Sequence, residues 1–293
     1  MTMTDRRRTS ADWRAAVWAT VLLMVAAAGG AGAIAARAQT APQPGDPCAA
    51  GDPQARIAAC TQVIGRGVEG AATIAAYVNR GHAYDALEQF DLAMKDFDAA
   101  LALDGDDGLA LRSRASALYR RGRLQEAIAD LSHAIAVRPD DAAALRARGA
   151  VEGELGLMKP AVEDFSKVLD REPGDLAARQ LRGLALAALG EHGRAILDFN
   201  RILERDPRSR VARAARAFSL FRTRQYRLAI LDWDQLLARD PEQPAVIYCR
   251  GAAKILGGDE EGGRADIALV RQQKPEVAAA QAAVCPSGTA AAR

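Results

Sequence analysis

Residues 108–141 of this chain read GLALRSRASALYRRGRLQEAIADLSHAIAVRPDD, and residues 142–175 read AAALRARGAVEGELGLMKPAVEDFSKVLDREPGD. In both stretches an Arg at the seventh position is followed, sixteen residues later, by an Asp. The same spacing recurs every 34 residues, in the pairs Arg80/Asp96, Arg114/Asp130, Arg148/Asp164, Arg182/Asp198, Arg216/Asp232 and Arg250/Asp266. A fixed period of roughly 20 to 50 residues is typical of stacked structural repeats, so we predict a repeat array without a single compact centre.

Other positions of the 34-residue unit recur as well. The units are residues 74–107, 108–141, 142–175, 176–209, 210–243 and 244–277. Position 8 is small: Gly81, Ala115, Gly149, Gly183, Ala217 and Gly251. Position 20 is also small: Ala93, Ala127, Ala161, Ala195, Ala229 and Gly263. Position 24 is large and apolar: Phe97, Leu131, Phe165, Phe199, Trp233 and Ile267. We expect two antiparallel helices per unit that cross at the small residues and pack through the apolar stripe.

This pattern resembles the tetratricopeptide repeat, over about 204 residues at one register. The resemblance implies an all-α fold: a right-handed α-solenoid of about six 34-residue helix-turn-helix repeats, with capping helices at both ends. Two departures are notable. Arg179 and Arg213 occupy position 4, where the family often has an apolar residue. The last unit has Gly263 at position 20 and the glycine-rich turn Gly257-Gly258, so we expect it to be the most loosely packed.

The recurrent Arg at position 7 replaces an aliphatic residue common in the family. With the Asp at position 23 it is expected to form a bidentate ion pair. The pairing lies either within one repeat or between one repeat and the next, as from Asp96 to Arg114. The alternative is a row of anion-binding arginines.

The N-terminal 38 residues are typical of an export signal. A positive start containing Arg6, Arg7 and Arg8 precedes an uncharged run over 15–36, and Ala36-Arg37-Ala38 provides a cleavage site after Ala38. The mature protein is then periplasmic or secreted; the alternative is an uncleaved segment that anchors it to the inner membrane, facing the periplasm. Without those residues the formal net charge of +2 becomes −1, and nothing indicates nucleic acid as a partner.

Four cysteines in an oxidising compartment suggest two disulfides. In the solenoid that the resemblance implies, Cys48 and Cys60 precede the array, and Cys249 and Cys285 lie at its far end. Bridged Cα atoms are usually no more than about 7 Å apart, so we predict the pairs Cys48–Cys60 and Cys249–Cys285.

The remaining segments follow from composition. We expect a flexible lead at 39–52, a degenerate capping half-repeat at 53–73, the six repeats at 74–277, a capping helix at 276–285 and a disordered tail at 286–293.

No catalytic constellation is evident. His82, His133 and His192 stand at three different repeat positions, so they are not expected to converge on a metal ion or a catalytic site. We expect no cofactor, no metal and no enzymatic activity.

In proteins that this chain resembles, positions 2, 5, 9, 12 and 13 of each first helix line the concave face. Carried over, these positions are expected to form a partner groove, basic near one end and apolar near the other. Its residues are Arg112, Ser116, Tyr119, Arg120, Arg146, Glu154, Gln180, Phe218, Phe221, Arg222 and Tyr248. Such a face suits a peptide or helix of an unidentified protein partner. The sequence therefore predicts an interaction scaffold or adaptor of the bacterial cell envelope; the alternatives are an accessory subunit of an envelope enzyme complex and a self-assembling solenoid.

Overall fold

A computed structural model describes residues 48, 51–67 and 70–287. The export signal and most of the flexible lead lie outside these residues, as does the tail from 288 onward. The described residues contain 14 helices and no strand, and they fall into two compact units divided between Pro173 and Gly174. Each unit is described by itself.

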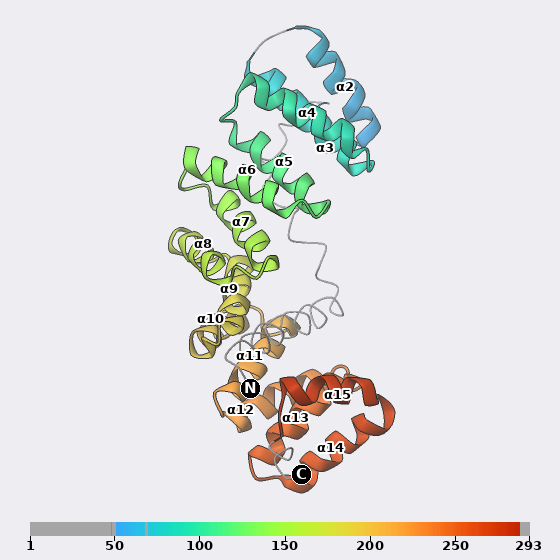
Figure 1. Cartoon of the computed structure of the whole chain (residues 1–293), viewed down its shortest axis with the longest axis vertical. Helices are drawn as coiled ribbons and strands as arrows, with labels where there is room; N and C mark the ends of the chain where they lie inside the picture. Colours follow the sequence, from blue (N-terminus) through green and yellow to red (C-terminus); the bar gives the residue numbers. More distant parts are fainter. Residues whose placement is uncertain (1–47, 49–50, 68–69, 288–293) are drawn as a thin grey trace, which may run out of the picture. The chain divides into compact units, whose positions relative to one another are not determined.

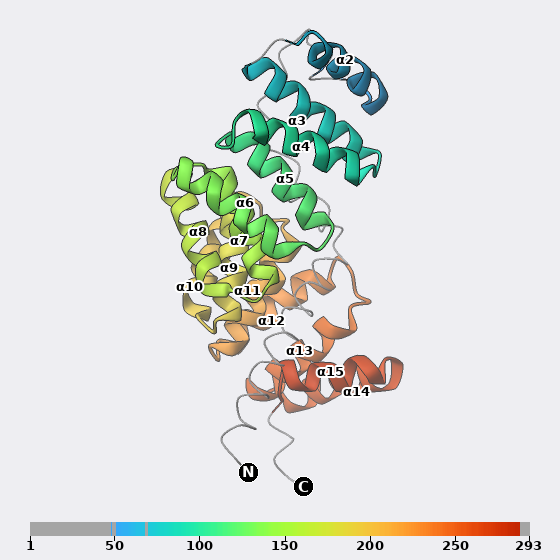
Figure 2. The ribbon, with the colours of Figure 1, turned by 45° about the horizontal axis from the view of Figure 1, so that its top comes forward.

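The first unit contains seven helices (Figure 1): α2 (Pro53–Gly65), α3 (Ala71–Ala86), α4 (Phe90–Leu103), α5 (Gly108–Arg120), α6 (Leu124–Val137), α7 (Ala142–Glu154) and α8 (Met158–Arg171). The second also contains seven: α9 (Leu176–Ala188), α10 (His192–Arg205), α11 (Arg210–Arg222), α12 (Tyr226–Leu237), α13 (Pro244–Leu256), α14 (Glu260–Gln273) and α15 (Pro275–Val284). In each unit, consecutive helices pack against one another in chain order, as α3 and α4 do in both ribbon views (Figures 1 and 2). This confirms the predicted all-α solenoid class.

The last residue of each of the first four repeats caps the first helix of the next one. Asp107, Asp141, Asp175 and Ser209 each accept a hydrogen bond from the backbone N–H three residues later, at 2.7, 3.0, 2.9 and 3.3 Å. A side-chain oxygen at this position satisfies a backbone donor that the helix itself leaves without a partner. The 34-residue period therefore sets where each repeat begins.

The small residue at position 8 makes room for the ring at position 24 of the same repeat. A Cβ atom added at Gly81 would lie 2.6 Å from the Phe97 ring, and one added at Gly149 would lie 2.9 Å from the Phe165 ring. The rings of Phe97 and Phe165 are almost fully buried. The two helices of a repeat thus pack closely because one of them has no side chain at this point.

The last repeat differs from its prediction. At the crossing of α13 and α14, a Cβ atom added at Gly263 would lie 2.4 Å from the carbonyl oxygen of Gly251. The two backbones therefore approach very closely, and the expectation of loose packing is wrong at this crossing. Both residues are glycines, so no Cβ holds the helices apart.

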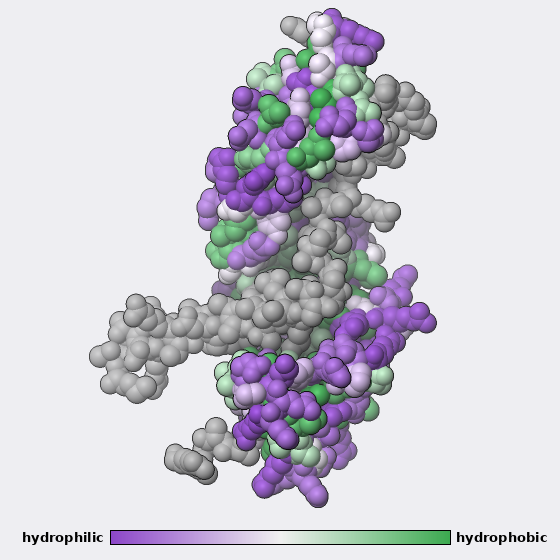
Figure 3. Space-filling view, turned by 90° about the vertical axis from the view of Figure 1, so that its right-hand side faces the viewer, coloured by the Kyte–Doolittle hydropathy of each residue, from purple (hydrophilic) through white to green (hydrophobic). Residues whose placement is uncertain are grey.

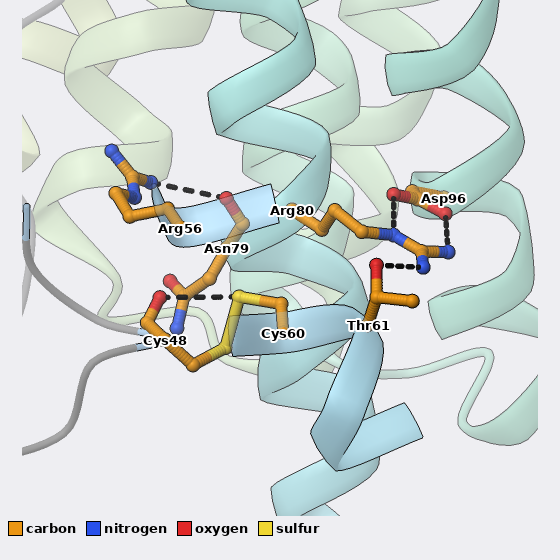
Figure 4. The surroundings of a disulfide bond; sticks show 7 residues. All are labelled: Cys48, Arg56, Cys60, Thr61, Asn79, Arg80 and Asp96. Atoms are coloured by element: carbon orange, nitrogen blue, oxygen red, sulfur yellow. Dashed lines mark hydrogen bonds and ion pairs between the residues drawn. A yellow bond between two sulfur atoms is a disulfide. The ribbon is translucent and has the colours of Figure 1, made fainter. Parts of the chain in front are cut away.

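Every one of the six Arg–Asp pairs is bidentate and lies within one repeat. In the first, Arg80 donates from Nε and Nη2 to the two carboxylate oxygens of Asp96, at 2.8 and 2.7 Å (Figure 4). The others have the same geometry, with distances of 2.6–2.9 Å. The hydrogen bonds to Asp96 raise the pKa of Arg80 above its usual value.

The remaining Nη1 group links a repeat to the one before it. Arg114 donates to Asp98 at 2.7 Å, and Arg216 donates to Asn200 at 2.8 Å. Asp98 and Asn200 both occupy position 25 of the preceding repeat. The same guanidinium therefore joins three helices, and it serves packing between helices instead of forming a free anion-binding row.

The arginines that interrupt position 4 have a related role. Arg179 approaches Asp198 at 3.4 Å, and Arg213 approaches Asp232 at 3.4 Å. Each therefore adds a second cation to the buried carboxylate of its own repeat. An ion pair here replaces the apolar contact of the family pattern.

The structure contains both predicted cystine pairs. Cys48 is bonded to Cys60 of α2 with a Cα–Cα distance of 4.7 Å (Figure 4). Cys249 of α13 is bonded to Cys285, directly after α15, with a Cα–Cα distance of 5.2 Å. The second bridge fastens the last helix to the last repeat. Among the described residues, no helix has both the length and the apolar character needed to cross a bilayer.

Candidate functional site

The first helices α5 and α7 carry the predicted groove residues of the first unit. Ser116, Tyr119 and Arg146 are half-buried, and Arg120 is exposed. Arg112 is also half-buried, and its Nε group contacts the carbonyl oxygen of Gly108 at 3.1 Å and the carboxylate of Asp141 at 3.4 Å. The guanidinium of Arg112 is therefore held by groups at the start of α5 and just before α7.

Side chains at positions 12 and 13 connect successive first helices. Asp85 of α3 forms an ion pair with Arg120 of α5, and the hydroxyl of Tyr119 in α5 donates a hydrogen bond to Glu154 of α7. Burial, together with the hydrogen bond to Glu154, raises the pKa of the Tyr119 phenol. Each contact joins position 12 of one repeat to position 13 of the next. We call these four residues the polar ladder.

The polar ladder changes the predicted electrostatics of this face. Arg120 is neutralised by Asp85, and Arg112 lies beside Asp141. The predicted basic end of the groove is therefore wrong for these two arginines, because acidic residues of neighbouring helices balance them. The face offers paired charges and hydrogen-bonding groups instead.

A histidine lies beside the polar ladder. His82 of α3 shares a hydrogen bond of 2.9 Å with the hydroxyl of Ser113 in α5. Burial, followed by the nearby charges of Arg56 and Arg120, lowers the pKa of His82 to about 4, so its ring is neutral at pH 7. Ser113 is only 4% exposed, which keeps a substrate away from its hydroxyl. The pair has the composition of a nucleophile and base, but it lacks the access that catalysis requires.

The first-helix face of the second unit is more apolar. Gln180 and Phe218 are half-buried, and Arg222 is exposed, with its guanidinium 5.8 Å from the Phe218 ring centre. The ring of His192 meets Phe218 edge-on at 6.0 Å. This face therefore carries a half-buried aromatic ring, that of Phe218, with the exposed guanidinium of Arg222 beside it.

Two predicted groove residues belong to the core of the second unit. Phe221 is 4% exposed and packs against the rings of Tyr226 and Trp233, with ring centres 5.7 and 6.0 Å apart. Tyr248 is 2% exposed and belongs to the same buried cluster. Their prediction as groove residues is wrong, because both side chains are buried in this cluster.

The polar ladder was not predicted from the sequence. Glu154 was among the predicted groove residues, but Asp85 was not, although it stands at position 12, which the family pattern places on this face. The signal present in the sequence was that complementary polar side chains stand 35 residues apart, in Asp85/Arg120 and in Tyr119/Glu154. Within the described part of the chain, no group of three or more His, Cys, Asp or Glu residues has a geometry that could hold a metal ion.

Family models match much of the repeat array. The model described as tetratricopeptide repeat matches residues 74–107, and another model with the same description matches residues 152–210. A model described as TPR repeat matches residues 115–156. No curated protein matches the sequence significantly.

Several solved structures share the fold. A tetratricopeptide repeat protein from Parabacteroides merdae ATCC 43184 is 18% identical, covers 80% of this chain and 92% of its own, and has a TM-score of 0.54. YrrB, described as a TPR protein with an unusual peptide-binding site, is 19% identical, with 62% and 95% coverage and a TM-score of 0.57. PilW, described as a widely conserved type IV pilus biogenesis factor, is 19% identical, with 70% and 96% coverage and a TM-score of 0.56. These likenesses show a shared fold, and the matching family models together with the repeated helix pairs identify residues 74–107 and 115–210 as tetratricopeptide repeats.

Proposed function

We propose that this chain is a non-catalytic interaction protein of the bacterial cell envelope that binds a peptide or helix on its first-helix face. The observation that carries the proposal is the polar ladder on α3, α5 and α7. Arg120 and Glu154 are exposed, Tyr119 is half-buried, and the polar groups of the ladder are held in place by one another. A partner finds preoriented donors and acceptors there, so little side-chain freedom is lost on binding.

The kind of partner follows from the charges. Because Arg120 and Asp85 are paired, the face favours a partner with polar groups of both signs over a uniformly acidic one. In the second unit, Phe218 and Arg222 provide an apolar and aromatic contact for a hydrophobic side chain. YrrB, which shares the fold, is described by its peptide-binding site, and this supports the same class of ligand here.

The envelope location is supported by two observations. The N-terminal sequence is typical of an export signal, and both cystines occupy buried sites at the beginning and end of the described helices. Cystines persist in oxidising compartments such as the periplasm.

Site-specific photocrosslinking in intact cells tests the proposal. A photoreactive residue at Ser116, beside the polar ladder, is expected to capture a discrete envelope protein. The matched control is the same residue at Ala129, which is exposed on the second helix α6 of the same repeat. Capture at Ser116 that disappears in a Tyr119→Phe, Glu154→Gln variant supports the proposal. Equal capture from both positions, or capture unchanged by the ladder variant, contradicts it.

A further inference from the structure

The outer side of α10 and α12 carries three leucines with unusually high exposure. Leu197 is 65% exposed, Leu228 is 50% exposed and Leu231 is 56% exposed. Leu197 and Leu231 occupy position 22 of consecutive repeats, and Leu228 lies one helical turn before Leu231. We call these three residues the leucine patch. It lies entirely within the second unit, on second helices.

Other repeats show what this position requires. Position 22 is occupied by Lys95, Ala129, Glu163 and Ala265 in the remaining four repeats. All four are exposed, and none is a large apolar residue. On the surface shown in Figure 3, hydrophilic residues likewise separate small hydrophobic areas. Packing within the fold therefore does not demand leucine at position 22, and the patch has another cause.

Arginines surround the leucines of the leucine patch in the sequence. Residues 222–231 read RTRQYRLAIL, with three arginines and no acidic residue. Arg224 and Arg227 are exposed, and no acidic partner is found for either among the described residues. On α10, the side chain of Arg201 is 71% exposed, and the carboxylate paired with it, that of Glu204, is 4.0 Å away.

The nearby acidic groups are largely occupied. Asp234 of α12 accepts a hydrogen bond from Arg250 at 2.8 Å, and Glu191 accepts one from Arg194 at 2.6 Å. Asp232 is only 2% exposed and is held by Arg216. The surface around the leucine patch is therefore both apolar and cationic.

We propose that the leucine patch docks on an anionic membrane surface. Leucines flanked by arginines combine the two interactions that hold a protein at a bilayer interface: burial of apolar side chains among acyl chains and attraction of cations to anionic headgroups. A stable protein interface uses roughly 20 to 30 residues on each side, far more than three leucines supply. A bilayer needs no matching pocket, and its lipids adapt to leucines that stand on two helices.

Vesicle co-sedimentation of the full-length chain tests this proposal. Vesicles of phosphatidylcholine alone are compared with vesicles that also contain phosphatidylglycerol, and the chain is expected to bind the anionic vesicles more tightly. Replacement of both Leu197 and Leu231 by Ser is expected to weaken this binding roughly tenfold. Arg227→Gln is expected to weaken it about fivefold and to reduce its dependence on salt. Any contribution of the uncharged segment 15–36 is the same in all variants.

The matched control is Leu92→Ser in α4. Leu92 is 41% exposed and occupies position 19 of its repeat, as Leu228 does, but Asp91 stands next to it. This variant is expected to bind like the unchanged chain. Unchanged circular dichroism verifies that all variants fold. Equal binding to both kinds of vesicle, or binding that the leucine variant leaves unaltered, overturns the proposal; so does an equal loss in the Leu92→Ser control.

Discussion

Replacing Gly263 by Ala would install the residue that stands at position 20 in the five other repeats. By the consensus pattern, this change should stabilise the last repeat. Ala also favours a helix interior over Gly by about 1 kcal/mol. The structure predicts the opposite result, because the position lies where α13 and α14 cross with almost no space between their backbones.

The magnitude follows from the contacts of the added methyl group. Its carbon would lie 2.4 Å from the carbonyl oxygen of Gly251, 2.6 Å from Cγ1 of Ile255 and 2.8 Å from the backbone nitrogen of Ile255, whereas ordinary contacts begin at 3.4 Å. Two of these atoms belong to the backbone of α13, so a rotamer change cannot relieve the clash. Overpacking of this kind costs about 1–3 kcal/mol. After subtraction of the gain in helix propensity of about 1 kcal/mol, we expect a net loss of up to about 2 kcal/mol.

Gly193→Ala is the matched control. Gly193 lies in α10, and a Cβ atom added there meets nothing within 4 Å. This variant is expected to gain about 0.5–1 kcal/mol. Urea unfolding followed by circular dichroism compares the two variants, and amide hydrogen exchange in α13 and α14 shows whether the loss is confined to the last repeat. Equal stabilisation by both substitutions would refute the close crossing of the two helices.

Three further predictions concern buried charges and the cystines. Glu152 in α7 is buried, which raises its pKa to about 7, so its ionisation should destabilise the fold as the pH rises from about 4.5 to 7. The Glu152→Leu variant should therefore be more stable by about 1–3 kcal/mol at pH 8 and by little at pH 4. A gain in the free energy of urea unfolding that does not depend on pH would contradict this prediction. Arg80→Leu should lower the free energy of unfolding by about 3 kcal/mol, because it leaves the Asp96 carboxylate buried without its partner. The double variant Arg80→Leu, Asp96→Leu should recover most of this loss. In a double-mutant cycle, an equal loss in the single and the double variant would count against the ion pair. Replacing Cys249 and Cys285 by Ser should lower the free energy of unfolding by about 4 kcal/mol, because the bridge closes a loop across a separation of 36 residues in the unfolded chain. An unchanged midpoint of thermal unfolding would show that the bridge does not stabilise the last helix.

The sequence by itself determined the repeats. The period of 34 and the small residues at positions 8 and 20 are local signals, because each acts through its own helix or through the neighbouring one. The two cystine pairs followed once the array placed the cysteines at opposite ends. Bidentate geometry could also be anticipated, since an Arg and an Asp sixteen residues apart meet across one helix hairpin.

Only the tertiary structure decided which faces are accessible and how charges pair between repeats. Phe221 shares its repeat position with the half-buried Tyr119, and Tyr248 shares its position with the half-buried Arg146, but both Phe221 and Tyr248 are buried in the core of the second unit. Arg120 has the charge of a basic groove, but Asp85 of the preceding repeat neutralises it. Repeat position specifies the direction of a side chain within its own unit, whereas exposure and charge balance depend on the residues that the adjacent units present.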